Sequence, residues 1–201
     1  KEPVLLPVTF PNILTNNTLG IAVGMASSIC SFNLAEVCNT TIALLKDENA
    51  DIKDTLIAPD FAGGGIILYD ESDIDGVYNT GRGSIKVRSK WNYVKEDNVI
   101  EITEIPPTTT VEAIIDKVAD LVKQGKIKEI NDVRDETDLN GLKLTFDLKR
   151  GQDPEKFMRK LFRSTPLEDN FSANFNILIG GSPRVMGIRE ILTEWTAYRM
   201  G

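Results

Sequence analysis

The sequence predicts an α+β fold in which a mixed or antiparallel sheet packs against helices. Segments with helical spacing and segments with strand alternation are interleaved along the chain, and they form no regular βα repeat. The chain has 201 residues, of which 41% are hydrophobic and 26% are charged, as is ordinary for a soluble globular protein. A chain of this length can bury a substantial core in one domain or slightly more.

Four segments have the apolar spacing of amphipathic helices. The first two begin with a capping box, in which a polar N-cap residue is followed three positions later by glutamate. The third has proline at its first helical position, where the missing N–H group costs nothing. The four helices are expected at residues 33–46, at residues 109–124, from Asp153 onward, and from Gly187 to the end of the chain.

Six runs between these helices alternate apolar and polar residues, which is typical of strands with one buried face. A polar stretch at residues 95–98 separates two of the runs and is expected to be a hairpin turn. The six expected strands are residues 65–69, 84–93, 99–105, 129–134, 142–149 and 173–179.

The residue types exclude several kinds of chemistry. Histidine is absent, and the only cysteines are Cys30 and Cys38. A zinc site of the usual cysteine and histidine type is therefore nearly excluded, as are Ser-His-Asp and Cys-His catalysis. No apolar run approaches the roughly 20 residues of a membrane helix, and Lys1 opens no signal-peptide pattern. We therefore expect a cytoplasmic protein without a membrane partner, and a fragment, since the chain begins in an extended segment.

A cationic stretch at residues 82–90 stands out in a chain whose net charge is −7. A chain with this net charge is not expected to bind nucleic acid over its whole surface, so a polyanion would bind only at a local cationic patch. Successive side chains of a strand point to opposite faces, which puts Lys86, Arg88 and Lys90 on one face and leaves Trp91 on the other. Arg82 lies in the turn before this strand. The patch is either a phosphate-binding surface or the solvated face of an amphipathic strand.

A second stretch, at residues 11–26, is a turn-rich loop followed by small and apolar residues. Two glycines, Gly20 and Gly24, bracket its three central residues, of which the first two are Ile21 and Ala22. By composition alone, the segment is a buried strand with close backbone approach at the two glycines.

Several sequence motifs, which follow one another in the same order as in the family, resemble the A subunit of bacterial type IIA topoisomerases, which are DNA gyrase and topoisomerase IV. They are FPNIL, GIAVGMA and NLAEV near the start, then TGRG, EIP, RDETD, GL and the closing helix. These motifs extend over essentially the whole chain. Under this resemblance, residues 1–28 are the end of the winged-helix region with a DNA-bending loop, residues 29–186 are the tower domain, and residues 187–201 begin a coiled-coil helix.

The resemblance also implies roles for individual residues. Ile21, with Ala22 beside it, corresponds to the apolar wedge that enters a base step and kinks the duplex. The TGRG turn and the strand after it correspond to the part of the tower domain that holds the arms of the bent DNA. Arg82, Lys86 and Arg88 are the expected phosphate contacts. Lys90 is a weaker candidate because it lies further along the strand.

The same resemblance implies that the chain has no catalytic residue of its own. The family cleaves DNA with a tyrosine that lies upstream of the position of Lys1, so the chain alone is expected to be inactive. Magnesium and ATP are expected on the partner B subunit. The implied partners are double-stranded DNA, the B subunit in an A2B2 holoenzyme, and a second copy of the A subunit.

Two hypotheses for the function therefore stay open. In the first, the chain binds and bends DNA within an enzyme that changes DNA topology by ATP-dependent double-strand passage. In the second, it is a non-catalytic structural and packing module with little DNA affinity of its own. The sequence does not distinguish gyrase from topoisomerase IV.

Overall fold

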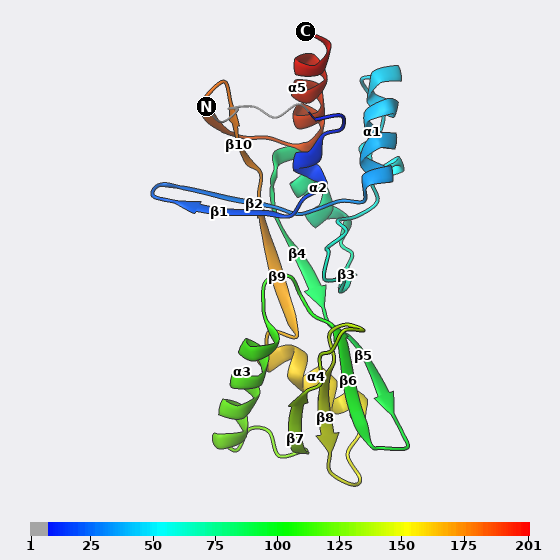
Figure 1. Ribbon diagram of the computed structural model, residues 1–201, viewed down its shortest axis with the longest axis vertical. Helices are drawn as coiled ribbons and strands as arrows, with labels where there is room; N and C mark the ends of the chain where they lie inside the picture. The colour runs from blue at the N-terminus through cyan, green and yellow to red at the C-terminus, as the bar shows by residue number, and fades with distance from the viewer. Residues whose placement is uncertain (1–7) are drawn as a thin grey trace. The chain divides into compact units, whose positions relative to one another are not determined.

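The computed structural model describes residues 8–201, which form two compact units that are described separately below (Figure 1). The first unit holds the described residues up to Ala62 together with Tyr69–Ile85 and Ser172–Gly201. The second unit holds Gly63–Leu68 and Lys86–Phe171. Strands β4 (Arg82–Arg88) and β9 (Glu168–Asn174) contribute residues to both units.

The second unit is built on a four-stranded antiparallel sheet with the order β5-β6-β8-β7. The hairpin turn expected at residues 95–98 joins β5 to β6, and Asn98 takes a positive φ of 53° there. The amide of Asn98 donates to the carbonyl of Leu148, which ties the turn to the neighbouring strand. The strands are β5 (Lys90–Val94), β6 (Val99–Glu104), β7 (Ile130–Asp135) and β8 (Leu144–Leu148), and a short strand β3 (Ile66–Leu68) pairs with β4.

One face of this sheet is buried under two helices, α3 (Val111–Lys123) and α4 (Pro154–Ser164). Ile100 and Ile102 of β6 and Leu144 and Phe146 of β8 are fully buried at every second position on the face that the helices cover. Phe146 and Phe157 meet edge to face, with ring centroids 6.1 Å apart. The fully buried members of this core include Ile100, Ile102, Ile114, Leu144, Phe146 and Leu161.

The opposite face of the same sheet carries ion pairs. Arg134 pairs with Asp147 across β7 and β8 and with Glu136 at 3.0 Å. Lys143 pairs with Glu101 at 3.0 Å. The sequence run that contains Arg134 is therefore part of a strand whose charges are matched by its neighbours.

The first unit combines a hairpin of β1 (Thr18–Ala22) and β2 (Met25–Ile29) with three helices. A second hairpin consists of β10 (Asn176–Ile179) and β11 (Ser182–Val185). The core contains Phe32 and Tyr78, whose rings meet edge to face at 5.8 Å. The helices are α1 (Leu34–Lys46), α2 (Glu71–Thr80) and α5 (Ile188–Met200), and two short 3-10 turns cover Asn12–Leu14 and Ile52–Asp54.

A tight junction connects α2 to β4 in this unit. Gly81 ends α2 with a left-handed φ of 70°, and a Cβ atom at this position would collide with the carbonyl group of Met186. The Gly81 carbonyl accepts a hydrogen bond from the N–H of Phe175 at 2.8 Å, and the Phe175 carbonyl accepts one from Met186 at 3.2 Å. The side chain of Phe175 is fully buried. Only glycine satisfies both the backbone angle and the close approach.

The α+β class and the four expected helices are confirmed, with small shifts at their ends. The N-cap of α3 is Thr110 and not Thr109, since the Thr110 side chain accepts from the N–H of Ala113. Helix α2 was not predicted, although its start follows a standard N-cap, because Asp70 accepts from the first N–H groups of the helix.

The single strand expected at residues 84–93 is wrong. The chain leaves one sheet and enters another at Ser89, because β4 pairs with β3 whereas β5 pairs with β6. Ser89 is fully buried at this point, and its N–H donates to the carbonyl of Leu167. The run expected at residues 173–179 is likewise two strands, β9 and β10, which separate at Phe175.

Among residues 8–201, no helix is both long enough and apolar enough to cross a membrane. The predicted division at residues 28 and 186 refers to a larger protein and stays a prediction, and its first seven residues lie outside the described part of the chain.

The Gly81 junction gives a first testable prediction. Gly81→Ala should lower the free energy of unfolding by about 2–5 kcal/mol, because a left-handed non-glycine residue costs ~1–2 kcal/mol and overpacking adds ~1–3 kcal/mol. Gly180 is the matched control, since its φ is also positive, at 58°, but no atom lies within 4 Å of its Cβ position. Gly180→Ala should show the backbone cost alone in urea unfolding. Equal losses for the two variants would contradict the close packing at Gly81.

Candidate nucleic-acid interface

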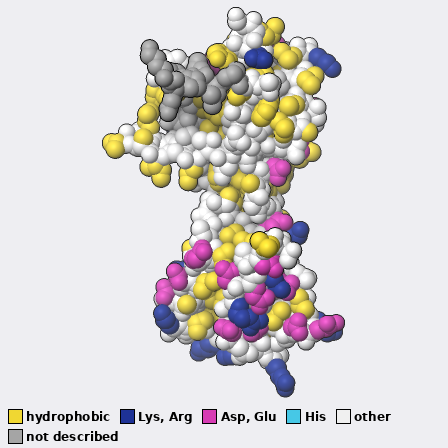
Figure 2. All heavy atoms as spheres, in the orientation of Figure 1, with side chains coloured by type: hydrophobic (Ala, Val, Ile, Leu, Met, Phe, Trp, Pro, Cys, Tyr) yellow, Lys and Arg dark blue, Asp and Glu magenta, His cyan; other side chains and the backbone are white. Residues whose placement is uncertain are grey.

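The β1–β2 hairpin projects from the first unit (Figure 1), and its large apolar side chains are between 44% and 105% exposed. Ile21 is 87% exposed and lies one residue before the pair that closes the turn, opposite Ala26. Figure 2 shows hydrophobic side chains at the free end of the hairpin. The exposed large residues of the hairpin are Leu19, Ile21, Val23 and Met25.

The interpretation of this segment as a buried strand is wrong. Both Gly20 and Gly24 have no atom within 4 Å of their Cβ positions, so neither glycine is there for close packing within the chain. Gly24 instead has a φ of 80° in the two-residue turn between Ala22 and Met25, where a left-handed residue is needed. The result is a narrow apolar projection with a tight end.

Strands β9 and β10 hold strand β2 of this hairpin close to its turn. The side-chain amides of Asn174 and Asn176 donate to the carbonyl of Ala26, which lies opposite Ile21, at 2.9 and 3.4 Å. The hydroxyl of Ser27 donates to the carbonyl of Asn176 at 2.9 Å, and Ser28 is paired with Asn174 in the sheet. These contacts hold the backbone of β2 while the side chains of Ile21 and Val23 remain exposed. No role for these two asparagines was predicted from the sequence. They flank the buried Phe175, and a polar residue on each side of an aromatic residue is the pattern that could have indicated them.

Two of the four predicted cations are exposed and unpaired. Arg82, in the first unit, and Lys86, in the second unit, form no ion pair with any residue between 8 and 201. Lys86 follows the predicted alternation, because Ile85 and Val87 on either side of it are buried. Arg82 was expected in a turn before the strand, but it is the first residue of β4, because Gly81 alone ends α2.

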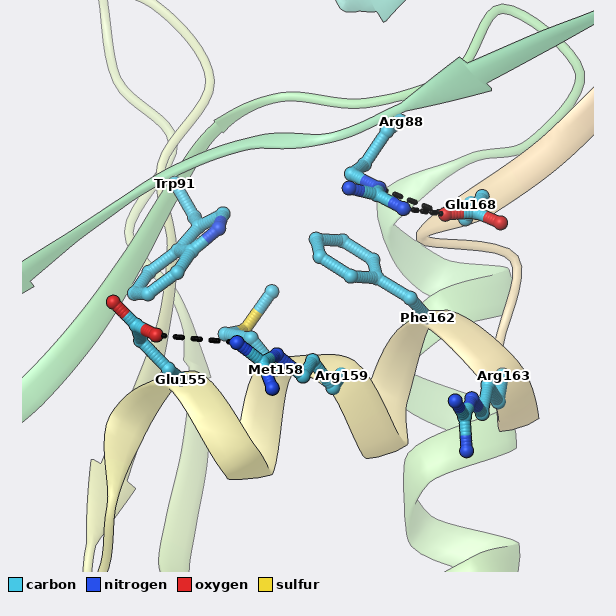
Figure 3. Close-up of a pocket in the computed structure, with 8 residues that line it drawn as sticks. All are labelled: Arg88, Trp91, Glu155, Met158, Arg159, Phe162, Arg163 and Glu168. Atoms are coloured by element: carbon cyan, nitrogen blue, oxygen red, sulfur yellow. Dashed lines mark hydrogen bonds and ion pairs between the residues drawn. The ribbon is translucent and has the colours of Figure 1, made fainter. Parts of the chain in front are cut away.

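Arg88 interacts with two other residues of the second unit. Its guanidinium pairs with Glu168 at 2.6 Å and lies over the ring of Phe162, 4.6 Å from the centroid. Figure 3 shows Arg88, Trp91 and Phe162 around one shallow cavity of about 380 Å³, with Glu168 on its rim. Arg88 and Trp91 were predicted on opposite faces of one strand. The change of sheet at Ser89 brings them to the same cavity.

Lys90 also has a carboxylate partner. Its ammonium lies 3.6 Å from Glu104, and the same carboxylate accepts a hydrogen bond from the N–H of Gly65 at 2.7 Å. Lys90 remains more than half exposed. The structure therefore brings Ile21 and Ala22 together at one hairpin, but it does not present the four cations as a single free row.

No tyrosine in the described chain has the setting of an activated nucleophile. Burial, reinforced by the nearby Cys30 and Glu36, raises the pKa of the Tyr78 hydroxyl above its ordinary value. The hydroxyl of Tyr93 lies 2.9 Å from Asn98 and stabilises a turn. Within residues 8–201, no group of three acidic or cysteine side chains is placed to hold a metal ion.

Comparison with known proteins identifies a family. The family described as the A subunit of DNA gyrase/topoisomerase IV matches residues 1–201. The DNA gyrase A subunit of Ureaplasma parvum serovar 3 is 42% identical over 206 residues, which cover 100% of this chain and 24% of that protein. The DNA topoisomerase 4 A subunit of Rickettsia conorii is 41% identical over 209 residues, which cover 98% of this chain and 28% of that protein. The chain therefore spans about a quarter of the length of these relatives.

The asparagine contacts to β2 give a second prediction. Removing both amides in Asn174→Ala/Asn176→Ala should speed amide hydrogen exchange in the hairpin roughly 5- to 30-fold, since each net hydrogen bond is worth about 1 kcal/mol. Exchange in the helices should not change. Asn170→Ala is the control, because this asparagine lies on β9 and is exposed. Unchanged exchange at residues 18–29 in the double variant would show that the asparagines do not hold the hairpin.

A third prediction separates the two kinds of cation. Arg88→Ala should lower the free energy of unfolding by about 1 kcal/mol, because it removes a partly exposed ion pair and a contact with an aromatic ring. Lys86→Ala should change it by less than about 0.5 kcal/mol, as is usual for an unpaired surface residue. Urea unfolding of the two variants measures the difference. A larger loss for Lys86→Ala would contradict the assignment.

Proposed function

The chain belongs to the family of DNA gyrase/topoisomerase IV A subunits, and from this premise we propose that it is the part of a type II topoisomerase that binds and bends duplex DNA. The observation that carries the proposal is the hairpin whose strand β2 is hydrogen-bonded to β9 and β10 while apolar side chains at its end are exposed. An exposed apolar cluster on a soluble domain has a partner in most cases. In this family the natural partner is the duplex.

Ile21 is the proposed wedge. A branched aliphatic side chain that enters a base step through the minor groove separates the stacked bases and kinks the duplex. Unstacking costs a few kcal/mol, and the bent duplex then contacts more protein surface, which offsets the cost. The narrow hairpin suits the minor groove, and the small side chain of Ala22 beside Ile21 keeps the end slim. The hydrogen bonds at Ala26 and Ser27 would keep the hairpin in place while Ile21 enters the base step.

The exposed cations are the proposed phosphate contacts. Arg82 and Lys86 are available for this role without any rearrangement. Arg88 and Lys90 contribute only by exchanging a carboxylate partner for a phosphate. Phosphate contacts position a protein on DNA and carry no base specificity. The bending step thus selects a deformable base step, while the cations set the overall affinity.

The remaining assignments follow from the same premise. In the parent enzyme one duplex is bent and cleaved and a second duplex passes through the break, in a cycle driven by ATP. We assign cleavage to a tyrosine outside this chain, and ATP and magnesium to the partner B subunit of an A2B2 holoenzyme with two A subunits. Residues 29–186 are the proposed tower domain, and residues 187–201 begin its exit into a coiled-coil helix.

A second candidate is a packing module with little DNA affinity of its own. The net charge of −7 and the carboxylate partners of Arg88 and Lys90 favour it. In such a module the apolar end of the hairpin would pack against another part of the parent protein and not against DNA.

Bending by Ile21 is tested in the full-length A subunit with its partner B subunit. Fluorescence energy transfer between the two ends of a short duplex should rise on binding, and Ile21→Ala should abolish most of this rise. Leu139→Ala is the control, since Leu139 is a fully exposed aliphatic residue of the second unit. Equal bending by the Ile21 variant and the unmodified protein would remove the wedge from the proposal.

Phosphate contact by β4 is tested by the salt dependence of DNA affinity in the same full-length protein. Arg82→Ala/Lys86→Ala should reduce the slope of log K against log salt by about 1.8, which is roughly 0.9 for each lost contact. Lys123→Ala/Lys126→Ala removes the same charge elsewhere and should leave the slope unchanged. Matching slopes for the two double variants would favour the packing module.

A further inference from the structure

Helix α4 carries a cationic stripe that the sequence pattern did not single out. Four cations occupy positions i, i+3, i+4 and i+7, which lie on one side of a helix. The opposite side of α4 carries Phe157, Met158 and Leu161, which are buried in the core of the second unit. The stripe is therefore held in place by the packing of the helix. Its members are Lys156, Arg159, Lys160 and Arg163.

The charge of this stripe is only partly matched. Lys160 pairs with Glu129 at 2.5 Å, and Arg159 has a loose, exposed partner in Glu155 at 3.5 Å. Lys156 and Arg163 have no ion pair with any described residue and are exposed. The helix itself contains one acidic residue against four basic ones, in a chain that is acidic overall. Such a local excess of positive charge favours an anionic partner.

Two shallow grooves run beside the stripe, and Arg159 and Arg163 line both of them. The larger groove, of about 650 Å³, also contains Lys156 and Lys160. The smaller groove is the cavity of Figure 3, which contains Arg88. In that view Arg88 points into the cavity, whereas Arg163 points away from it along the outer side of the helix. Glu155 and Glu168 also line the smaller groove, and Glu168 already pairs with Arg88, so the free positive charge forms one surface along α4 beside the larger groove.

The form of this surface fits a long polyanion better than a small anion. Its cations are spread along the helix and open to solvent, and no group of them converges on one enclosed point. Lys156 and Arg163 are seven residues apart, which is about 10 Å along a helix. Each strand of duplex DNA advances about 3.4 Å along the duplex axis for each phosphate, so a helix lying along that axis passes about three phosphates over this distance.

We propose that the exposed side of α4 binds the phosphate backbone of duplex DNA, as a contact surface additional to β4. This inference rests on the proposed function, because it takes duplex DNA as the polyanion that the parent protein binds. Lys156, Arg159 and Arg163 make the contacts, and Lys160 stays with Glu129. The surface reads no bases, since phosphate contacts carry no sequence information.

The test uses the full-length A subunit with its partner B subunit, and the probe is a short blunt-ended duplex. The variant is Lys156→Gln/Arg159→Gln/Arg163→Gln, in which glutamine preserves helix propensity. The matched control is Lys117→Gln/Lys123→Gln/Lys126→Gln, which removes three exposed, unpaired cations on and just after α3 in the same unit. Both variants change the net charge by the same amount, so a general electrostatic effect appears in both.

The slope of log K against log salt should fall in magnitude by about 2.7 in the α4 variant, roughly 0.9 for each contact, and should stay unchanged in the α3 control. Replacing the two arginines by lysine, in Arg159→Lys/Arg163→Lys, should preserve the slope. Equal slopes for the α4 variant and the control would overturn the inference. If the triple variant fails to fold, Lys156→Gln/Arg163→Gln touches no ion pair, and a fall of about 1.8 is expected.

The β4 variant Arg82→Ala/Lys86→Ala, measured beside these, separates the inference from its premise. A lower slope for β4 with no change for α4 overturns the α4 surface and leaves the proposed function intact. No change in either variant overturns both. A lower slope for α4 alone supports the inference and moves the phosphate contacts away from β4.

Discussion

The close approach of Gly81 to the Met186 carbonyl is the constraint on which the candidate interface depends. It brings together the end of α2, the start of β4 and Met186, the residue after β11, and the N–H of Phe175, between β9 and β10, binds the Gly81 carbonyl there. Because Phe175 is buried and fixed there, the asparagines on either side of it reach strand β2 of the β1–β2 hairpin at Ala26. A glycine without a side chain thus determines where an apolar projection is anchored.

The backbone of the hairpin and its exposed side chains contribute differently to stability. Hydrogen bonds at Ala26 and Ser27 hold the backbone of β2 to β9 and β10, whereas the exposed side chain of Ile21 gains little from folding. Leaving a large aliphatic side chain in water forgoes roughly 1.5–3 kcal/mol of possible burial. A partner that takes up this side chain recovers that stabilisation, which gives the end of the hairpin an affinity for an apolar space such as an opened base step. The cationic surfaces add affinity without choosing where the wedge enters.

Local signals predicted the helices but could not predict the strand pairing. Helices α1, α3 and α4 begin at capping side chains whose partners lie within three residues, so the pattern contains the whole cause. The break at Ser89 depends on which strands lie beside β4 and β5, and Arg88 finds Glu168 at a separation of 80 residues. The position of the wedge, Ile21, was predicted from the resemblance to a family, whereas only the structure revealed that its side chain is exposed. The α4 stripe was visible as helical spacing of cations, but its grooves were not.

The central claim is that the end of the hairpin is free in the protein and is covered by DNA. It is tested most directly by the rate at which a thiol reagent labels Ile21→Cys in the full-length protein with its partner B subunit, in a background without other reactive thiols. Labelling should be fast without DNA and should slow at least tenfold with saturating duplex, while a cysteine at Leu139 should react at the same rate in both. Slow labelling without DNA, or no protection with DNA, would contradict the claim.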